Sequence, residues 1–83
     1  MRSPQTLELR TTGGRPRHWL GDRPVNGGDA LELCFSGGWV VGRYEWDAEK
    51  QERPLFHCSI VLQEGDVAET VIEIPDGAVM RWP

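Results

Sequence analysis

The strongest strand signal in the sequence is Gly38-Trp39-Val40-Val41-Gly42-Arg43-Tyr44-Glu45-Trp46. Trp, Val and Tyr side chains suit a pleated, half-buried surface, so the stretch predicts the central strand of a small sheet. Side chains alternate between the two faces of a strand, which places Trp39 and Val41 on one face and Tyr44 and Trp46 on the other. A glycine in mid-strand, here Gly42, marks a bulge, a bend or the close approach of another backbone.

The residues before this stretch predict its hairpin partner. Asn26-Gly27-Gly28-Asp29 is a cluster of turn-forming residues, and Ala30–Phe35 then alternates apolar with polar or small side chains. Ser36-Gly37-Gly38 is a short, glycine-containing connection of the kind that joins two strands of a hairpin. We therefore expect residues 29–46 to form an antiparallel hairpin.

The rest of the chain carries further short strand signals between Gly- and Pro-containing turns. Polar residues 47–54 predict an exposed loop, and no stretch shows sustained helical periodicity. This pattern is typical of an all-β barrel or sandwich. The remaining predicted strands are Thr6–Thr11, Arg17–Leu20, Leu55–Gln63, Thr70–Ile74 and, as a strand or a single helical turn, Ala78–Pro83.

Length and composition favour one small folded domain. The chain has 83 residues, of which 27% are charged and 39% hydrophobic, as in a folded domain rather than a disordered segment. We expect a single domain over residues 1–83, with a loose start at residues 1–5. At this length the expected closed form is a small SH3-like barrel of five to seven short strands.

The charge is unevenly distributed. The formal net charge is −4. Residues 1–23 carry five arginines against Glu8 and Asp22, a net of +3, and residues 24–83 carry four basic residues against eleven acids, a net of −7. An acidic domain is a poor candidate for nucleic-acid binding, so we do not expect nucleic acid as the main partner. The basic N-terminal segment keeps nucleic-acid binding as an alternative.

The two cysteines, Cys34 and Cys58, are expected to be free thiols. Charged residues near the N-terminus interrupt any apolar signal core, and no run has the length of a transmembrane helix, so we expect a cytoplasmic protein without membrane contact. His18 and His57 lack the close Cys or His pairs of a zinc site, so no metal or cofactor is expected. His57 and Cys58 are neighbours that point to opposite faces, so we expect no Cys–His nucleophile and no enzyme.

The sequence resembles known proteins in two ways. Gly28–Leu33 followed by Gly38–Glu45 resembles the paired strands of SH3-like and Tudor-like barrels, in which a Gly-Asp turn often leads into an alternating strand and a Trp-bearing strand returns. The whole chain also resembles small single-domain bacterial proteins that have no assigned activity. In Tudor-like barrels, aromatic residues at one rim form a cage for a cationic side chain. Neither resemblance supplies a functional residue by matching.

The aromatic residues near the end of the central strand give the predicted binding site. Trp39 is expected in the core and Trp46 at the rim. The predicted function is a non-catalytic binding module that recognises a protein or peptide through an aromatic and acidic rim. One alternative is a small acidic inhibitor or anti-defence protein, which presents carboxylates to a nucleic-acid-binding enzyme where phosphates would sit. The candidate binding residues are Tyr44, Trp46, Glu45, Asp47 and Trp19.

Overall fold

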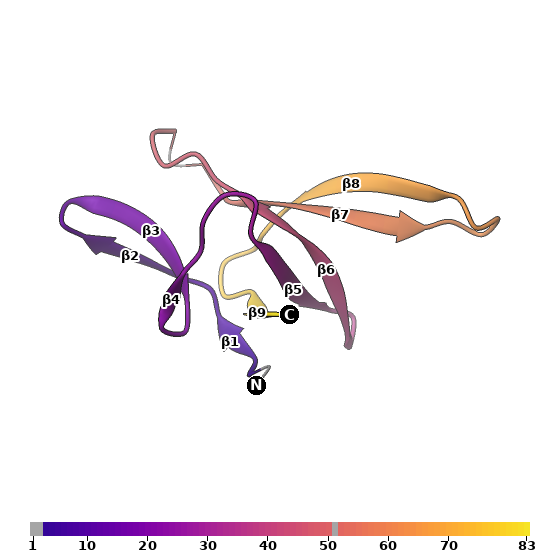
Figure 1. The fold of residues 1–83 in the computed structure, drawn as a ribbon, viewed down its shortest axis with the longest axis horizontal. Helices are drawn as coiled ribbons and strands as arrows, with labels where there is room; N and C mark the ends of the chain where they lie inside the picture. Colours follow the sequence, from indigo (N-terminus) through magenta and orange to yellow (C-terminus); the bar gives the residue numbers. More distant parts are fainter. Residues whose placement is uncertain (1–2, 51) are drawn as a thin grey trace.

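The protein is all-β in the computed structural model, which describes residues 3–50 and 52–83 (Figure 1). Within this part of the chain, nine strands form two antiparallel sheets, and the predicted fold class is confirmed at this level. No helix there is long and apolar enough to cross a membrane. The strands are β1 Gln5–Thr6, β2 Glu8–Thr12, β3 Arg15–Leu20, β4 Arg23–Pro24, β5 Ala30–Phe35, β6 Gly38–Glu45, β7 Leu55–Val61, β8 Val67–Glu73 and β9 Val79–Arg81.

The larger sheet has the strand order β1-β9-β5-β6-β7-β8, and the smaller one has the order β2-β3-β4. The first and last strands of the chain therefore lie side by side. The hairpins β2–β3 and β7–β8 extend to opposite sides of the molecule, which measures 49 × 30 × 18 Å (Figure 1). A barrel closes only when its edge strands pair. Edge strands β1 and β8 do not pair with each other in the described residues, so the closed SH3-like barrel is not confirmed.

The predicted central hairpin is confirmed as β5–β6. Phe35 pairs with Gly38, which leaves Ser36 and Gly37 as a two-residue loop. Their φ angles are 50° and 77°, and positive φ at both loop positions is typical of the turn whose twist matches a hairpin. The register runs through Gly42 without a bulge, so the glycine marks a close approach and leaves the alternation intact.

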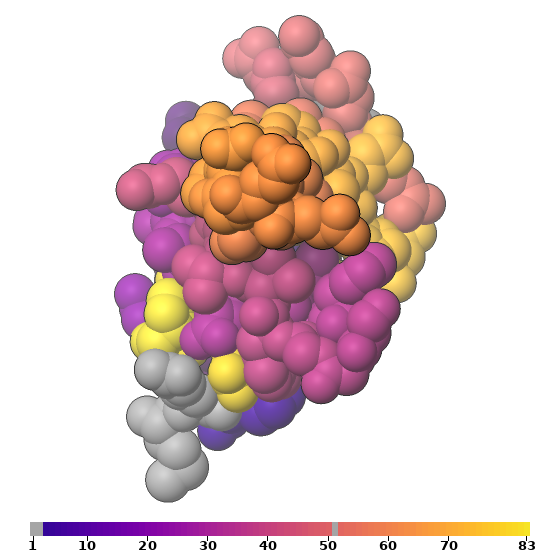
Figure 2. Space-filling view, turned by 90° about the vertical axis from the view of Figure 1, so that its right-hand side faces the viewer, coloured from indigo at the N-terminus to yellow at the C-terminus, as the bar shows by residue number. Residues whose placement is uncertain are grey.

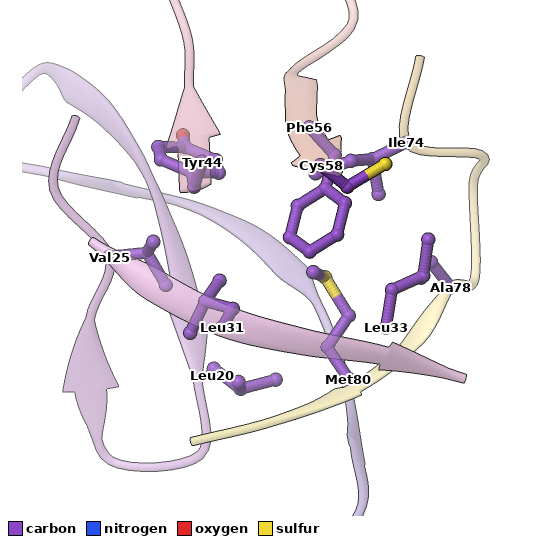
Figure 3. Close-up of a cluster of buried hydrophobic side chains, with 10 residues drawn as sticks. All are labelled: Leu20, Val25, Leu31, Leu33, Tyr44, Phe56, Cys58, Ile74, Ala78 and Met80. Carbon is purple, nitrogen blue, oxygen red and sulfur yellow. The ribbon is translucent and has the colours of Figure 1, made fainter. Parts of the chain in front are cut away.

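The core lies on one face of β5, β6, β7 and β9, where residues from the end of β3 and from the loops after β4 and β8 pack against it (Figure 3). Cross-strand partners share a face, and Leu31 pairs with Gly42 while Leu33 pairs with Val40. The core face of β6 is therefore the face that carries Val40, Gly42 and Tyr44. The buried cluster consists of Leu20, Val25, Leu31, Leu33, Tyr44, Phe56, Cys58, Ile74, Ala78 and Met80.

This register reverses the predicted positions of two tryptophans. Trp46 is half-buried and packs against the buried cluster, so its expected separation from the core is wrong. Trp39 lies on the outer face of β6, half-buried beneath the Arg81 guanidinium, whose carbon is 3.9 Å from the ring centroid. The placement of Trp39 in the core is also wrong, because the apolar side chains Leu31 and Leu33 of β5 lie on the opposite face of the sheet from Trp39.

The strand count exceeds the expected five to seven for two reasons. The first predicted strand is divided at Leu7, which packs against the core and whose backbone N donates to Ala78 O over 3.1 Å. The chain there leaves β1, which pairs with β9, and enters β2, which pairs with β3. Arg23–Pro24 adds a further short strand. Gln5 belongs to β1, so the loose start does not extend to it, and residues 1–2 lie outside the described residues.

The two cysteines lie on opposite faces of the larger sheet. Cys34 pairs with Trp39 on the outer face and is exposed, whereas Cys58 pairs with Gly42 on the core face and is buried. A bond between the two sulfurs would have to pass through the sheet. Both thiols are free in this arrangement.

Candidate binding groove

A groove of about 630 Å³ lies between the β2–β3 hairpin and two loops of the larger sheet. One loop precedes β7 and the other joins β8 to β9. The volume falls within the usual range of ligand clefts. The lining residues are Leu7, Leu9, Thr11, Gly14, Pro16, His18, Trp46, Glu52, Arg53, Pro54, Ile74, Pro75, Asp76 and Gly77.

The hairpin register supplies one wall of this groove. Leu9 pairs with His18 and Thr11 pairs with Pro16, so these four side chains share one face of β2–β3. The hairpin extends past the core, and Leu9 is consequently 58% exposed although it is apolar. The wall is therefore an apolar surface that the described chain leaves open.

The rings of His18 and Trp46 form the floor of the groove, and the buried Tyr44 ring lies beneath them. His18 Nδ1 and the Tyr44 hydroxyl share a hydrogen bond of 2.6 Å, and the His18 ring meets the Trp46 ring edge-on with centroids 4.4 Å apart. Trp46 Nε1 donates to the backbone oxygen of Glu52 in the loop before β7. Each ring thus has a specific contact with another segment of the chain.

Burial keeps two of these rings neutral. It lowers the pKa of His18 below its usual value, because desolvation disfavours the imidazolium. It also raises the pKa of Tyr44, where desolvation is the largest cause, so the phenol keeps its proton. A neutral imidazole and a phenol can share their hydrogen bond without burying a charge.

The depressed His18 pKa predicts a loss of stability in acid. Below the unfolded-state pKa of about 6.5, the unfolded chain binds a proton at His18 that the folded chain does not bind. The free energy of unfolding therefore decreases as the pH is lowered through this range. Urea melts at about pH 7.5 and about pH 5.5 measure this loss. His18→Gln should reduce the difference between the two pH values, and the exposed-site control His57→Gln should retain it. A His18→Gln variant with the full wild-type difference would contradict the assignment.

Charged residues surround the groove on the side of the two loops. Arg53 Nη2 and Asp76 Oδ2 are 3.4 Å apart, and both side chains are well exposed. Asp47 Oδ1 accepts a hydrogen bond of 3.0 Å from the backbone N of Glu49. The charged side chains that line the groove on this side are Glu52, Arg53 and Asp76, two acids against one base, so this rim is net acidic.

The structure brings only part of the predicted site together. Trp46 lines the groove, and Asp47 is exposed at the start of the neighbouring loop. Tyr44 is only 2% exposed beneath His18, so its expected position at the rim is wrong. Glu45 is exposed on the outer face of the sheet and lines a second depression, of about 1100 Å³. Trp19 lies on the opposite face of β3 from His18.

Trp19 belongs to a basic face of the smaller sheet. The register places Arg10, Arg15 and Arg17 on its side of β2–β3. The Arg10 guanidinium lies 5.4 Å from the Trp19 ring centroid and forms an ion pair of 2.7 Å with Glu8. Part of the N-terminal positive charge is thus already engaged within the hairpin.

The sequence interpretation missed most residues that line the groove. Leu9, Pro16, Pro54 and Asp76 come from four separate segments that only the tertiary fold brings together. The one local signal was His18, a polar residue beside Trp19 in a short strand. No group of three or more His, Cys, Asp or Glu side chains in residues 3–50 and 52–83 is arranged to hold a metal ion. Comparisons with family models, curated proteins and solved structures found no match to the chain.

Proposed function

We propose that the protein is a non-catalytic binding module that holds a segment of a protein or peptide in the groove between β2–β3 and the two loops. The observation that carries this proposal is the open apolar wall at Leu9 above a floor that contains Trp46. Apolar surface that a small domain leaves exposed beside polar residues is typical of an interaction site. The contacts among the floor residues are already formed without a ligand, which keeps the cost of ordering the site on binding small.

The chemistry of the groove defines the partner. An apolar side chain of the partner would lie between Leu9, Pro54 and the Trp46 ring, where it loses contact with water. The net acidic rim favours an arginine or lysine beside that side chain. The expected ligand is therefore an extended segment with an apolar anchor next to a basic residue.

The proposed fold relationship remains the SH3-like or Tudor-like one. Its support is the pairing of the first strand with the last and the antiparallel succession β5-β6-β7 in the same sheet. The difference from the expected rim site is that the aromatic floor contains His18 and Trp46, with Tyr44 underneath. The proposal therefore concerns a groove for an apolar anchor, and an aromatic cage is not part of it.

Selection from a random peptide library displayed on phage tests the function. We expect enriched peptides with an apolar residue next to arginine or lysine. Leu9→Thr removes apolar surface from the wall, keeps a residue suited to a strand, and should weaken binding of those peptides about tenfold. Asp76→Lys reverses one rim charge and should weaken the peptides with the most basic flanks.

The matched control is Val41→Thr, which removes a similarly exposed side chain, 60% against 58%, from the outer face of the sheet. This variant should bind the selected peptides as the wild type does. The proposal fails if the library yields no enriched peptides, or if Leu9→Thr and Val41→Thr bind them equally well.

A further inference from the structure

We propose that β8 is a dimerisation edge, through which two copies of the chain pair antiparallel about Thr70 and join their larger sheets. β8 ends the strand order of the larger sheet in the described residues. Its hairpin with β7 projects from the body, and the space-filling view along that direction shows it standing in front of the surrounding surface (Figures 1 and 2). This inference is independent of the proposed function, which uses a different surface.

The projecting hairpin carries more exposed apolar surface than a two-stranded ribbon needs. Isolated hairpins are marginally stable in water, and long edge strands with apolar side chains invite pairing with another strand. Val61 at the end of β7 is 74% exposed and its partner Val67 is 64% exposed. The exposed apolar residues of the hairpin are Ile60, Val61, Leu62, Val67 and Val71.

The backbone of β8 is oriented for pairing at its outer edge. At the tip, Leu62 N donates to Asp66 O over 2.7 Å, and at the base, Ile74 N donates to Pro54 O over 2.8 Å. In the β7–β8 pair, the even-numbered residues therefore form the backbone hydrogen bonds between the two strands. Because bonded and non-bonded pairs alternate along an antiparallel ladder, the odd-numbered residues of β8 direct their N–H and C=O groups to the open edge. These residues are Val67, Glu69, Val71 and Glu73.

Charge and the length of strand overlap together select one register from those that the backbone allows. A two-fold pairing centred on Glu69 sets this residue against its own copy. Centring on Val71 sets Glu69 against Glu73 of the second copy, twice. Centring on Thr70 sets Glu69 against Val71 and Glu73 against Val67, so no acids lie directly opposite one another. Like charges directly opposite destabilise a strand pair, which argues against the centres Glu69 and Val71. Centres on Ala68 or Ile72 avoid opposing acids but overlap only a short end of β8, so Thr70 is the centre that pairs the whole strand without opposing acids.

The same register makes a continuous apolar row across the interface. Ala68 then lies opposite Ile72 of the second copy. Within each hairpin Ala68 pairs with Ile60, and Ile72 pairs with Phe56. Ile60, Ala68, Ile72 and Phe56 therefore follow one another on one face across four strands, two from each copy. Ala68, which ends this row in a single chain, gains the Ile72 side chain of the second copy as a direct apolar neighbour.

Two variants at one exposed position test the interface. Val71 is 49% exposed, so Val71→Glu and Val71→Lys should both fold, which far-UV circular dichroism checks. In the proposed register the introduced glutamate opposes Glu69 twice, and the introduced lysine forms two opposite-charge pairs instead. By sedimentation equilibrium, the 83-residue wild type should dimerise reversibly. The dissociation constants of the two variants should differ about tenfold, and the Val71→Glu dimer should be the weaker one.

Val41→Glu and Val41→Lys, on the outer face of β6, are the matched controls and should dimerise as the wild type does. A wild type that is monomeric at every concentration would overturn the proposal and leave the edge for a strand of another protein. Two Val71 variants with equal dissociation constants would also overturn it.

Cross-linking tests the register separately, in a Cys34→Ser, Cys58→Ser background. Thr70 forms a non-hydrogen-bonded pair with its own copy, where the Cα separation of about 4.5 Å suits a disulfide. Thr70→Cys should therefore give a covalent dimer on mild oxidation. Ala68→Cys should not give a covalent dimer, because residue 68 lies opposite Ile72 of the second copy, four residues away from the other cysteine. Equal cross-linking of the two variants would refute the register centred on Thr70.

Discussion

Phe56→Ala should lower the free energy of unfolding by about 3–5 kcal/mol, the usual range for truncating a buried aromatic residue. Phe56 is 0% exposed and is among the largest fully buried side chains. It pairs with Tyr44 on β6 and with Ile72 on β8, so its ring belongs to the centre of the larger sheet (Figure 3). A domain of this size has about 5–15 kcal/mol of stability in total, so urea melts should show a large shift of the midpoint.

A substitution at Gly42 shows where the Phe56 ring lies. A Cβ atom on Gly42 would be 2.6 Å from two carbons of the ring and 2.6 Å from the backbone oxygen of His57. Gly42→Ala should therefore cost about 1–3 kcal/mol by overpacking. In the Phe56→Ala background this cost should fall, because the ring is gone, but some should remain, because the His57 oxygen is still in place.

Gly38→Ala is the matched control for this cycle. Gly38 lies in the same strand, and the nearest atom to its added Cβ is the Phe35 backbone oxygen, at 3.8 Å. The control should change the free energy of unfolding by no more than about 0.5 kcal/mol. A Gly42→Ala cost as small as that of Gly38→Ala would show that the ring does not cover Gly42.

Local patterns were sufficient to predict the β5–β6 hairpin. Alternation, the turn-forming residues and a mid-strand glycine are properties of neighbouring residues, and each led to a correct statement about Ala30–Phe35, Gly38–Glu45 or Gly42. The facing of β6 was also within reach of the sequence. A two-residue loop at Ser36 and Gly37 pairs Leu33 with Val40, which places the core on the even-numbered face. The prediction instead placed the large Trp39 side chain in the core, and this put the core on the wrong face of β6.

The groove and the degree of closure were not within reach, because they depend on tertiary structure. β2 alternates as an inward-facing strand would, yet the β2–β3 hairpin leaves the larger sheet at Leu7 and exposes Leu9. No local pattern states where a hairpin points. Closure of a sheet similarly depends on the accumulated bend of all its strands, so strand signals alone did not distinguish a barrel from the two open sheets observed.

Trp46→Ala should cost more stability than Trp39→Ala, by an amount that urea melts can resolve. Trp46 packs against the core, meets the His18 ring edge-on and donates to the Glu52 backbone oxygen, so its loss should cost about 3–5 kcal/mol. Trp39 lies outside the buried cluster, and its main specific contact is the Arg81 guanidinium. Loss of that stacking and of a half-buried ring should cost about 1–2 kcal/mol.

Trp46→Phe separates the packing of this ring from its hydrogen bond. The phenyl group keeps most of the contact with the core and His18 but cannot donate to the Glu52 oxygen, so the variant should lose only about 1 kcal/mol. It should also lose affinity for groove-binding peptides, because the Trp46 donor holds the loop that carries Glu52 and Arg53 against the groove. If Trp39→Ala were the more damaging of the two alanine variants, the core face of β6 would be the face of Val41 and Arg43. Trp46 would then not form the floor of the groove.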